Sequence, residues 1–230
     1  MDPKTALIVG AGPGLSASLA RLFARKGLQV ALASRNPDKL AKLAEETAGT
    51  TFACEATEPE EVAALFDVVI ATQGVPDIVV YNASGRARGP VTGLNPEAVR
   101  EAIMVSGYGG FLVAQQAARL MLARGSGAIL LTGASASVKG YANSSSFAMG
   151  KFALRGLAQS LARELAPKGV HVAHFVIDGG IRSAGRPDPE GSPDSMLDPD
   201  AIAETYWNVA MQSRSAWTWE VELRPWVETF

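Results

Sequence analysis

Short apolar runs and longer amphipathic segments alternate along the whole chain. Runs rich in Val, Ile, Leu and Ala are typical of buried strands, whereas apolar residues spaced three and four apart are typical of helices. The pattern predicts buried strands at 6–9, 28–33, 51–54, 77–81, 128–132 and 170–177. It predicts helices between them, the longer ones at 15–26, 59–73, 96–123, 144–165 and 199–212.

Two helix starts carry a clear local pattern, at Asn36-Pro37 and at Asn95-Pro96. Asparagine is a good N-cap, and proline is favoured at the first helical position. Strands that are apolar on both faces and separated by helices imply a parallel sheet covered on both sides. We therefore expect an α/β fold of the Rossmann-like type, a doubly wound parallel sheet in three α/β/α layers.

The C-terminal part of the chain differs from this alternation. The segment 183–198 holds three prolines, two glycines and four acidic residues, and we interpret it as a mobile surface loop. Two interpretations of this loop are open, a solvated linker and a lid that covers a ligand. The period-two pattern of Trp217–Leu223 predicts an edge strand with Trp217 and Trp219 on one face. These tryptophans are expected in the core or at a subunit interface, with ligand stacking as the alternative.

Composition narrows the class of protein. The chain has 230 residues, 47% of them hydrophobic and 19% charged, with a net charge of -2. No composition break divides residues 1–230, so one domain is expected, and no basic run suggests nucleic acid. Cys54 is the one cysteine of the chain, so it has no second cysteine to pair with. The chain has two histidines, His171 and His174, and with so few possible ligands we expect no metal site. We interpret both histidines as core residues.

No leader segment and no apolar run of membrane-spanning length is visible, so we expect a cytoplasmic protein without a membrane partner. The first predicted strand passes through Gly10, Gly12 and Gly14 directly into a helix that begins at Leu15. Glycines there let the backbone approach a pyrophosphate, whose charge a helix N-terminus stabilises. A tight turn without a ligand is the alternative.

The chain resembles the short-chain dehydrogenase/reductase family from its first strand to roughly its last. The family's first turn is Thr-Gly-x-x-x-Gly-x-Gly, and its places are taken here by Val9, Gly10, Gly14 and Ser16. The resemblance implies that this turn, with Gly10, Gly12, Gly14 and Leu15, binds the cofactor. Ser16 replaces a glycine that allows close helix packing, so it is expected to loosen that fit without blocking phosphates.

The residues after the next strands indicate which cofactor is bound. The family places an acid after the second strand when the cofactor is NAD(H), and Ser34 and Arg35 stand here instead. An arginine can pair with a 2′-phosphate, so the resemblance implies NADP(H) rather than NAD(H). A solvated loop charge is the alternative for Arg35. The resemblance also places Glu55 near the adenine, Asn82 and Ala83 beneath the cofactor, and the backbone of Ile181 at the carboxamide.

The reaction centre departs from the family. Its tyrosine and lysine stand four residues apart on the helix after the fifth strand, and that spacing falls here on Phe147 and Lys151. Phenylalanine has no hydroxyl and cannot transfer a proton. The resemblance implies that Lys151 bonds the nicotinamide ribose, with an exposed helix lysine as the alternative. The family's serine position falls on Ala134, beside Ser135, and its asparagine position on Ser106.

A substitute proton donor is therefore expected, and Tyr141 is the first choice, with loop polarity as its ordinary alternative. Other hydroxyls in the same region are those of Ser135, Tyr108 and Ser144 to Ser146. The sequence predicts an NADP(H)-dependent oxidoreductase that acts on a small carbonyl or alcohol through a non-standard site, as a homodimer or homotetramer. The rival hypothesis is an NADP(H)-binding protein with little or no catalysis, such as a sensor or an assembly subunit.

Overall fold

Seven parallel strands form one sheet in the computed structural model, which describes residues 2–183 and 185–229. The strand order is β3-β2-β1-β4-β5-β6-β7, and every neighbouring pair is parallel. The strands are β1 (Thr5–Val9), β2 (Gln29–Ser34), β3 (Thr50–Ala53), β4 (Ile78–Tyr81), β5 (Gly127–Thr132), β6 (Val170–Ile177) and β7 (Glu220–Leu223). The order turns at β1, whose neighbours are β2 and β4, so the crevice between these strands lies at a topological switch point.

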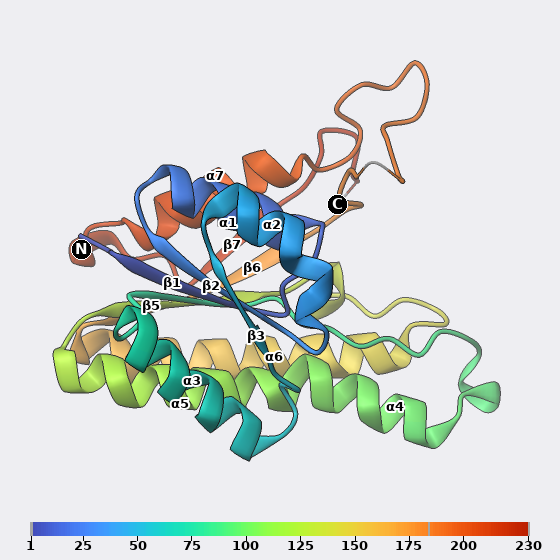
Figure 1. Ribbon diagram of the computed structural model, residues 1–230. Helices are drawn as coiled ribbons and strands as arrows, with labels where there is room; N and C mark the ends of the chain where they lie inside the picture. The colour runs from blue at the N-terminus through green and yellow to red at the C-terminus, as the bar shows by residue number, and fades with distance from the viewer. Residues whose placement is uncertain (1, 184, 230) are drawn as a thin grey trace.

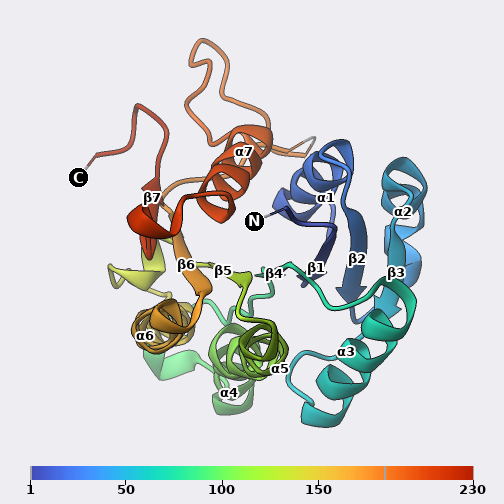
Figure 2. The same cartoon turned by 90° about the vertical axis from the view of Figure 1, so that its left-hand side faces the viewer.

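Helices cover both faces of the sheet (Figures 1 and 2). One face carries α1 (Leu15–Arg25), α2 (Ala41–Thr47) and α7 (Pro199–Ala210), and the other carries α3 (Pro59–Gln73), α4 (Pro96–Ile103), α5 (Gly109–Arg124) and α6 (Ser145–Leu165). Two hydrophobic cores result. Along β1, Ala6 and Ile8 belong to one core and Leu7 and Val9 to the other. Buried residues on both faces of each strand account for the continuous apolar runs, and the expected doubly wound fold is confirmed.

The long helix expected over 96–123 starts and ends as predicted but is not uniform. A π-helical turn, Met104–Tyr108, separates α4 from α5. Its Ser106 is fully buried, and the hydroxyl of Ser106 accepts a hydrogen bond from the Gly85 amide at 3.0 Å. The phenol of Tyr81 donates to the carbonyl of Val105 in the same turn. Turns of this kind occur often at functional sites, and this one supports the loop after β4.

The expected edge strand is present, but two parts of its prediction are wrong: the residue at which it begins, and the placing of Trp217 and Trp219 on one face. β7 begins at Glu220, because the Thr218 amide donates to the side chain of Gln212 instead of pairing with β6. Trp217 and Trp219 therefore precede the strand and have different partners. Trp217 stacks on His171 with ring centroids 4.7 Å apart, and the ring of Trp219 lies 5.7 Å from the Arg155 guanidinium.

Residues 185–198 leave the sheet as a projecting loop (Figure 1), and residue 184 of the predicted segment lies outside the described residues. The base of this loop is held by Arg182, which donates to Asp188 at 3.0 Å and also to Asp198. A single bridge pairs Ile181 with Leu197. Whether this loop is mobile remains a prediction.

Two features are absent from the described residues. Among residues 2–183 and 185–229, no helix is long and apolar enough to cross a membrane. No group of three His, Cys, Asp or Glu side chains in the same ranges could hold a metal ion.

Candidate functional site

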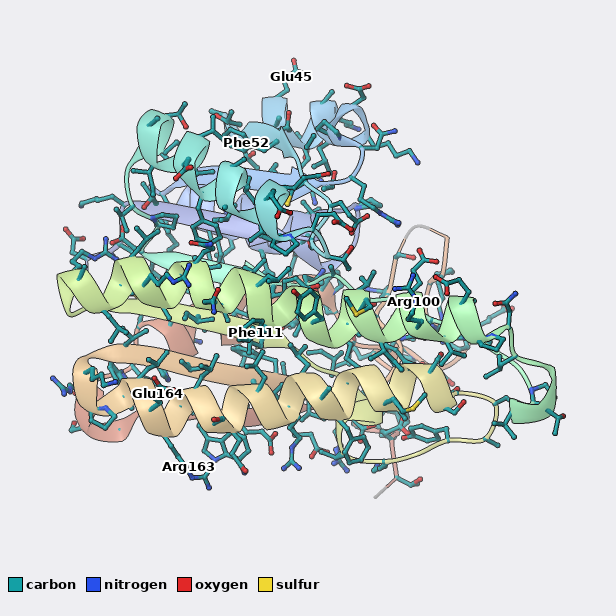
Figure 3. All side chains as sticks on the ribbon, turned by 90° about the horizontal axis from the view of Figure 1, so that it is seen from below. Glu45, Phe52, Arg100, Phe111, Arg163 and Glu164 are labelled. Carbon is teal, nitrogen blue, oxygen red and sulfur yellow. The ribbon has the colours of Figure 1, made fainter. Side chains whose placement is uncertain are left out.

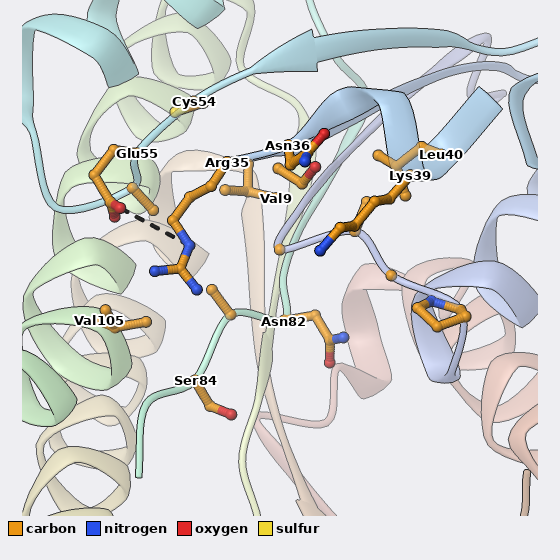
Figure 4. A pocket seen from close by; sticks show the side chains of 17 residues that line it. Val9, Arg35, Asn36, Lys39, Leu40, Cys54, Glu55, Asn82, Ser84 and Val105 are labelled. Atoms are coloured by element: carbon orange, nitrogen blue, oxygen red, sulfur yellow. Dashed lines mark ion pairs between the residues drawn. The ribbon is translucent and has the colours of Figure 1, made fainter. Parts of the chain in front are cut away.

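A cavity of about 410 Å³ opens at the carboxyl ends of β1 to β4, where the strand order turns (Figure 4). Its floor is the turn from Val9 to Pro13 and the loop from Asn82 to Ser84. Its far wall is formed by Arg35, Asn36 and Lys39 after β2, together with Glu55 after β3. In parallel sheets this edge is where ligands bind.

The turn after β1 has the geometry that a phosphate needs. Gly10 has φ +84°, and a Cβ there would lie 2.3 Å from the Ala83 amide nitrogen, so only glycine fits. Open space surrounds Gly12 and Gly14. The N-cap of α1 is Gly14, which offers no side-chain cap, so the first amides of α1 are available to a ligand.

Ser16 makes two side-chain hydrogen bonds that the sequence did not predict. Its side chain is buried, and its hydroxyl donates to the Gly10 carbonyl at 3.1 Å and accepts from Asn82 Nδ2 at 2.7 Å. The hydroxyl thus joins the turn after β1 to the loop after β4, and it occupies the room that a glycine would leave.

The cavity wall after β2 carries two cations, Arg35 and Lys39, whereas the sequence predicted only Arg35 there. Arg35 Nε lies 3.9 Å from Glu55 Oε2, the ion pair drawn in Figure 4, and the Arg35 side chain is largely exposed. Lys39 and Asn36 also line the cavity, and neither was predicted. Lys39 lies in the short helix Pro37–Leu40 that begins just after Arg35, and the predicted helix start at Asn36-Pro37 was the available indication. Ser34 lines the same wall.

A second cavity, of about 530 Å³, continues the first one and shares Asn82 and Ser84 with it. It lies at the carboxyl ends of β4, β5 and β6. The residues predicted from the sequence that line it are Leu15, Ser135, Tyr141, Phe147, Lys151 and Ile181. The structure therefore brings Ser135, Tyr141, Phe147 and Lys151 to one cavity, next to the predicted phosphate turn.

Lys151 is not an exposed helix lysine. Its side chain is 2% exposed, and its ammonium donates to the Thr132 carbonyl at 2.6 Å. Burial, with a smaller contribution from the positive charge of Arg86, lowers the pKa of Lys151 to about 7. A lysine with this pKa can hold or release a proton near neutral pH.

Phe147 lies one turn before Lys151 on α6 and faces the same cavity. The guanidinium carbon of Arg86 lies 3.7 Å from the centre of the Phe147 ring, and Lys151 Nζ lies 5.9 Å from it. Arg86 was not predicted as a site residue. The available indication was an arginine in the glycine-rich loop after β4, at the ligand-binding edge of the sheet.

The remaining candidate hydroxyls divide into two groups. Ser135, Tyr141 and Ser144 line the second cavity. Ser146 donates to the Ala87 carbonyl at 2.8 Å, and Tyr108 lies outside both cavities, where its ring is 6.1 Å from that of Phe111. The structure therefore does not place Tyr108 with the other candidates.

The two histidines are core residues, as expected. Both are buried on β6, and both rings are hydrogen-bonded. His174 Nδ1 lies 3.0 Å from Glu220, and burial nevertheless lowers the pKa of His174 to about 4. Neither histidine lines the two cavities.

Known proteins with similar sequences share this architecture. The sequence model of the short chain dehydrogenase family matches residues 4–186. An uncharacterized oxidoreductase of Staphylococcus aureus (strain N315) is 30% identical over 234 residues, with 98% of each chain covered. A D-threitol dehydrogenase of Mycolicibacterium smegmatis is 31% identical over 177 residues, which cover 75% of this chain and 68% of that one.

Solved structures agree with the sequence relatives. A short-chain dehydrogenase from Rhodopseudomonas palustris superposes with a TM-score of 0.83 at 34% identity, over 97% of this chain and 99% of that one. A metagenomic short-chain oxidoreductase in complex with NADP superposes with a TM-score of 0.84 at 27% identity, over 96% and 97%. This chain belongs to the short-chain dehydrogenase family.

Proposed function

We propose that this protein is an NADP(H)-dependent oxidoreductase that acts on a small carbonyl or alcohol through a non-standard active site. The observation that carries the proposal is the continuity of the two cavities, which runs from a phosphate-binding turn to a buried lysine. When bound there, NADPH supplies the hydride, and the protein positions the partners and manages one proton. The NADP complex of the related metagenomic oxidoreductase supports the choice of cofactor.

The first cavity fits the adenosine half of NADP(H). The turn at Gly10, Gly12 and Gly14 and the N-terminus of α1 would hold the pyrophosphate, because uncapped amides and the helix dipole favour an anion. Arg35 and Lys39 would hold the 2′-phosphate, since two cations face the place where NAD(H) enzymes of the family carry an acid. Asn82 and Ala83 form the floor on which the cofactor would lie.

The second cavity fits the nicotinamide half and the substrate. Lys151 would bond the nicotinamide ribose, and the backbone of Ile181 would meet the carboxamide. Phe147 stands in the position of the family's tyrosine and offers no proton. Tyr141, with Ser135 beside it, is the proposed source of the proton, because its phenol lines the cavity and is open to solvent.

The rival function is cofactor binding with little or no turnover, as in a sensor or an assembly subunit. Phe147 favours it, because general acid-base catalysis contributes about a hundred- to ten-thousand-fold in rate. The second cavity, of about 530 Å³ with Ser135 and Tyr141 in its wall, favours the enzyme, because it offers room and hydroxyl groups for a substrate beside the cofactor.

One experiment separates these functions. NADPH binding is measured by calorimetry, and NADPH oxidation is then followed with a panel of aldehydes, ketones and quinones. Tight binding with turnover is the expected result. Binding without turnover across the panel would leave the rival function, and failure to bind NADPH would contradict both.

We also propose that the protein forms a homodimer or homotetramer in the cytoplasm. On the face formed by α5 and α6, Phe111 projects from α5 (Figure 3), and its neighbour Tyr108 is also exposed. Met149 and Phe152 are 46% and 45% exposed on α6. Exposed apolar residues on adjacent helices are typical of an interface. Analytical ultracentrifugation tests this, with Phe111→Glu expected to give monomers.

A further inference from the structure

The second cavity has a one-sided charge. Arg86, Lys151 and Arg186 all line it, whereas no aspartate or glutamate does so among the described residues. The nearest acid in sequence to its β6 wall is Asp178, and Asp178 is committed elsewhere: its carboxylate lies 3.2 Å from Lys139 Nζ and 3.6 Å from the Arg224 guanidinium. Positive charge in a concave, partly enclosed site attracts an anion.

Arg86 is held in a defined orientation without an ionic partner. Its guanidinium carbon lies 3.7 Å above the Phe147 ring, which is the separation of stacked planar groups. A stacked guanidinium keeps its N–H groups along its edge, where they remain free to donate. Within residues 2–183 and 185–229, no carboxylate forms a salt bridge with Arg86. Partial burial and the neighbouring Arg88 lower the pKa of Arg86, so an anion beside it would be stabilising.

Phe147 has a second role in this arrangement. Its ring is 8% exposed and is covered by Arg86. A phenylalanine gives the guanidinium a flat apolar surface at the place where the family carries a hydroxyl. The loss of the tyrosine and the presence of Arg86 are therefore parts of one arrangement.

Arg186 contributes a second cation from the loop after β6. Its Nη2 lies 2.8 Å from the position that a Cβ at Gly180 would take, so the guanidinium is packed against the backbone of that turn. Arg86 and Arg186 thus reach the cavity from the loops after β4 and β6, with Lys151 at its base.

We propose that the substrate of this site carries a carboxylate, and that Arg86, stacked on Phe147, is the residue that binds it. The inference rests on the proposed function, because it names the class of that enzyme's substrate: a small organic acid with a carbonyl or hydroxyl group. The fork of N–H donors on a guanidinium matches a carboxylate with two parallel hydrogen bonds. Arg186 adds a second, weaker attraction from the opposite loop.

The test uses a pair of non-reacting probes that differ in charge, benzoate and benzamide. Each is titrated by calorimetry into the protein alone and into the protein saturated with NADPH. Benzoate is expected to bind about tenfold to a hundredfold more tightly than benzamide, since hydrogen bonds between charged groups contribute more than neutral ones. Phenyl phosphate serves as a third probe, and tighter binding of phenyl phosphate than of benzoate would overturn the carboxylate assignment.

Variants connect the preference to Arg86. Arg86→Gln is expected to remove the preference for benzoate, and Arg86→Lys to restore only part of it, because an ammonium lacks the planar fork. The matched control is Arg88→Gln, two residues away and outside the cavity, which is expected to leave the preference intact. Circular dichroism and the NADPH affinity of each variant show that the fold and the first cavity are preserved.

The outcomes separate this inference from the proposed function. Equal binding of benzoate and benzamide, or an unchanged preference in Arg86→Gln, would overturn the inference while NADPH binding leaves the proposed function standing. If NADPH does not bind, the proposed function fails, and the titration of the protein alone still decides whether Arg86 binds a carboxylate. For turnover, phenylglyoxylate is expected to be reduced with a lower KM than its methyl ester.

Discussion

The two cavities lie end to end along one edge of the sheet and share Asn82 and Ser84, yet their residues relate differently to the family pattern. The first keeps the glycine turn and presents Arg35 and Lys39 where a phosphate would lie. The second holds Lys151, and Arg86 lies over the ring of Phe147, the residue that the resemblance puts at the tyrosine position. Under the proposed function, binding a nucleotide and transferring a proton are separate properties, which mutations can remove one at a time.

The largest effect is expected from Tyr141→Phe in the second cavity. Removing the phenol should lower turnover by about a hundred- to ten-thousand-fold, because a positioned acid contributes that much, while NADPH affinity stays the same. Steady-state kinetics and calorimetry measure the two quantities separately. Tyr108→Phe is the matched control, since Tyr108 lies outside both cavities. An unchanged rate in Tyr141→Phe would remove this residue from the mechanism.

A change in the first cavity should affect both properties. Gly10→Ala places a Cβ 2.3 Å from the Ala83 nitrogen at a residue with φ +84°. Strain of this kind costs about 1–3 kcal/mol, and the displaced turn should also lose NADPH. Denaturant unfolding and calorimetry measure the two losses. Gly12→Ala is the control for stability, because its Cβ would meet open space; equal destabilisation by both changes would contradict the account.

Reversing a charge in the first cavity should change the preference for NADPH over NADH. Arg35→Asp is expected to weaken NADPH binding by about tenfold or more while NADH binding changes little, since a charge-assisted contact with the 2′-phosphate is lost. Lys39→Gln should give a smaller change in the same direction. Equal affinities of the unaltered protein for NADPH and NADH would refute the assignment of the cofactor.

The last effect concerns the pH dependence of stability. Burial lowers the pKa of Lys151 from 10.5 to about 7 in the folded protein. Between these values the unfolded chain binds more protons than the folded one, so the contribution of Lys151 makes the free energy of unfolding rise with pH. Lys151→Met lacks this contribution. The stability of the wild type relative to the variant should therefore increase from about pH 7 to about pH 9, as urea unfolding would measure; a constant difference would argue against the lowered pKa.

The fold was predictable because both faces of each strand are buried, so that each strand is a continuous apolar run in the sequence. Six strands, the Asn-Pro helix starts and the doubly wound architecture followed from that pattern, whereas the strand order came from the structure. The start of β7 did not, because the Thr218 amide donates to the side chain of Gln212, a residue outside the sheet. Period-two alternation does not indicate which side chains bind the backbone amides near the start of a strand.

The candidate site was predictable where its residues are tied to local geometry. The turn at Gly10 and the spacing of Phe147 and Lys151 are local patterns, and the structure places both at the cavities. Arg86 could not be found this way, because its position depends on contact between the loop after β4 and the helix after β5, far apart in the sequence. The hydrogen bonds of Ser16 were not predicted for the same reason, since its partner Asn82 comes from another strand.

The π-helical turn at Met104–Tyr108 has a consequence for insertions and deletions. Deleting one residue there would restore a regular helix and rotate the preceding part by about 100° relative to the part that follows. Ala102 and Ser106 support Gly85, which stands immediately before Arg86, and a Cβ at Gly85 would lie 2.7 Å from the Ala102 Cα. A one-residue change in helix length would thus redirect the arginine that we propose selects the substrate.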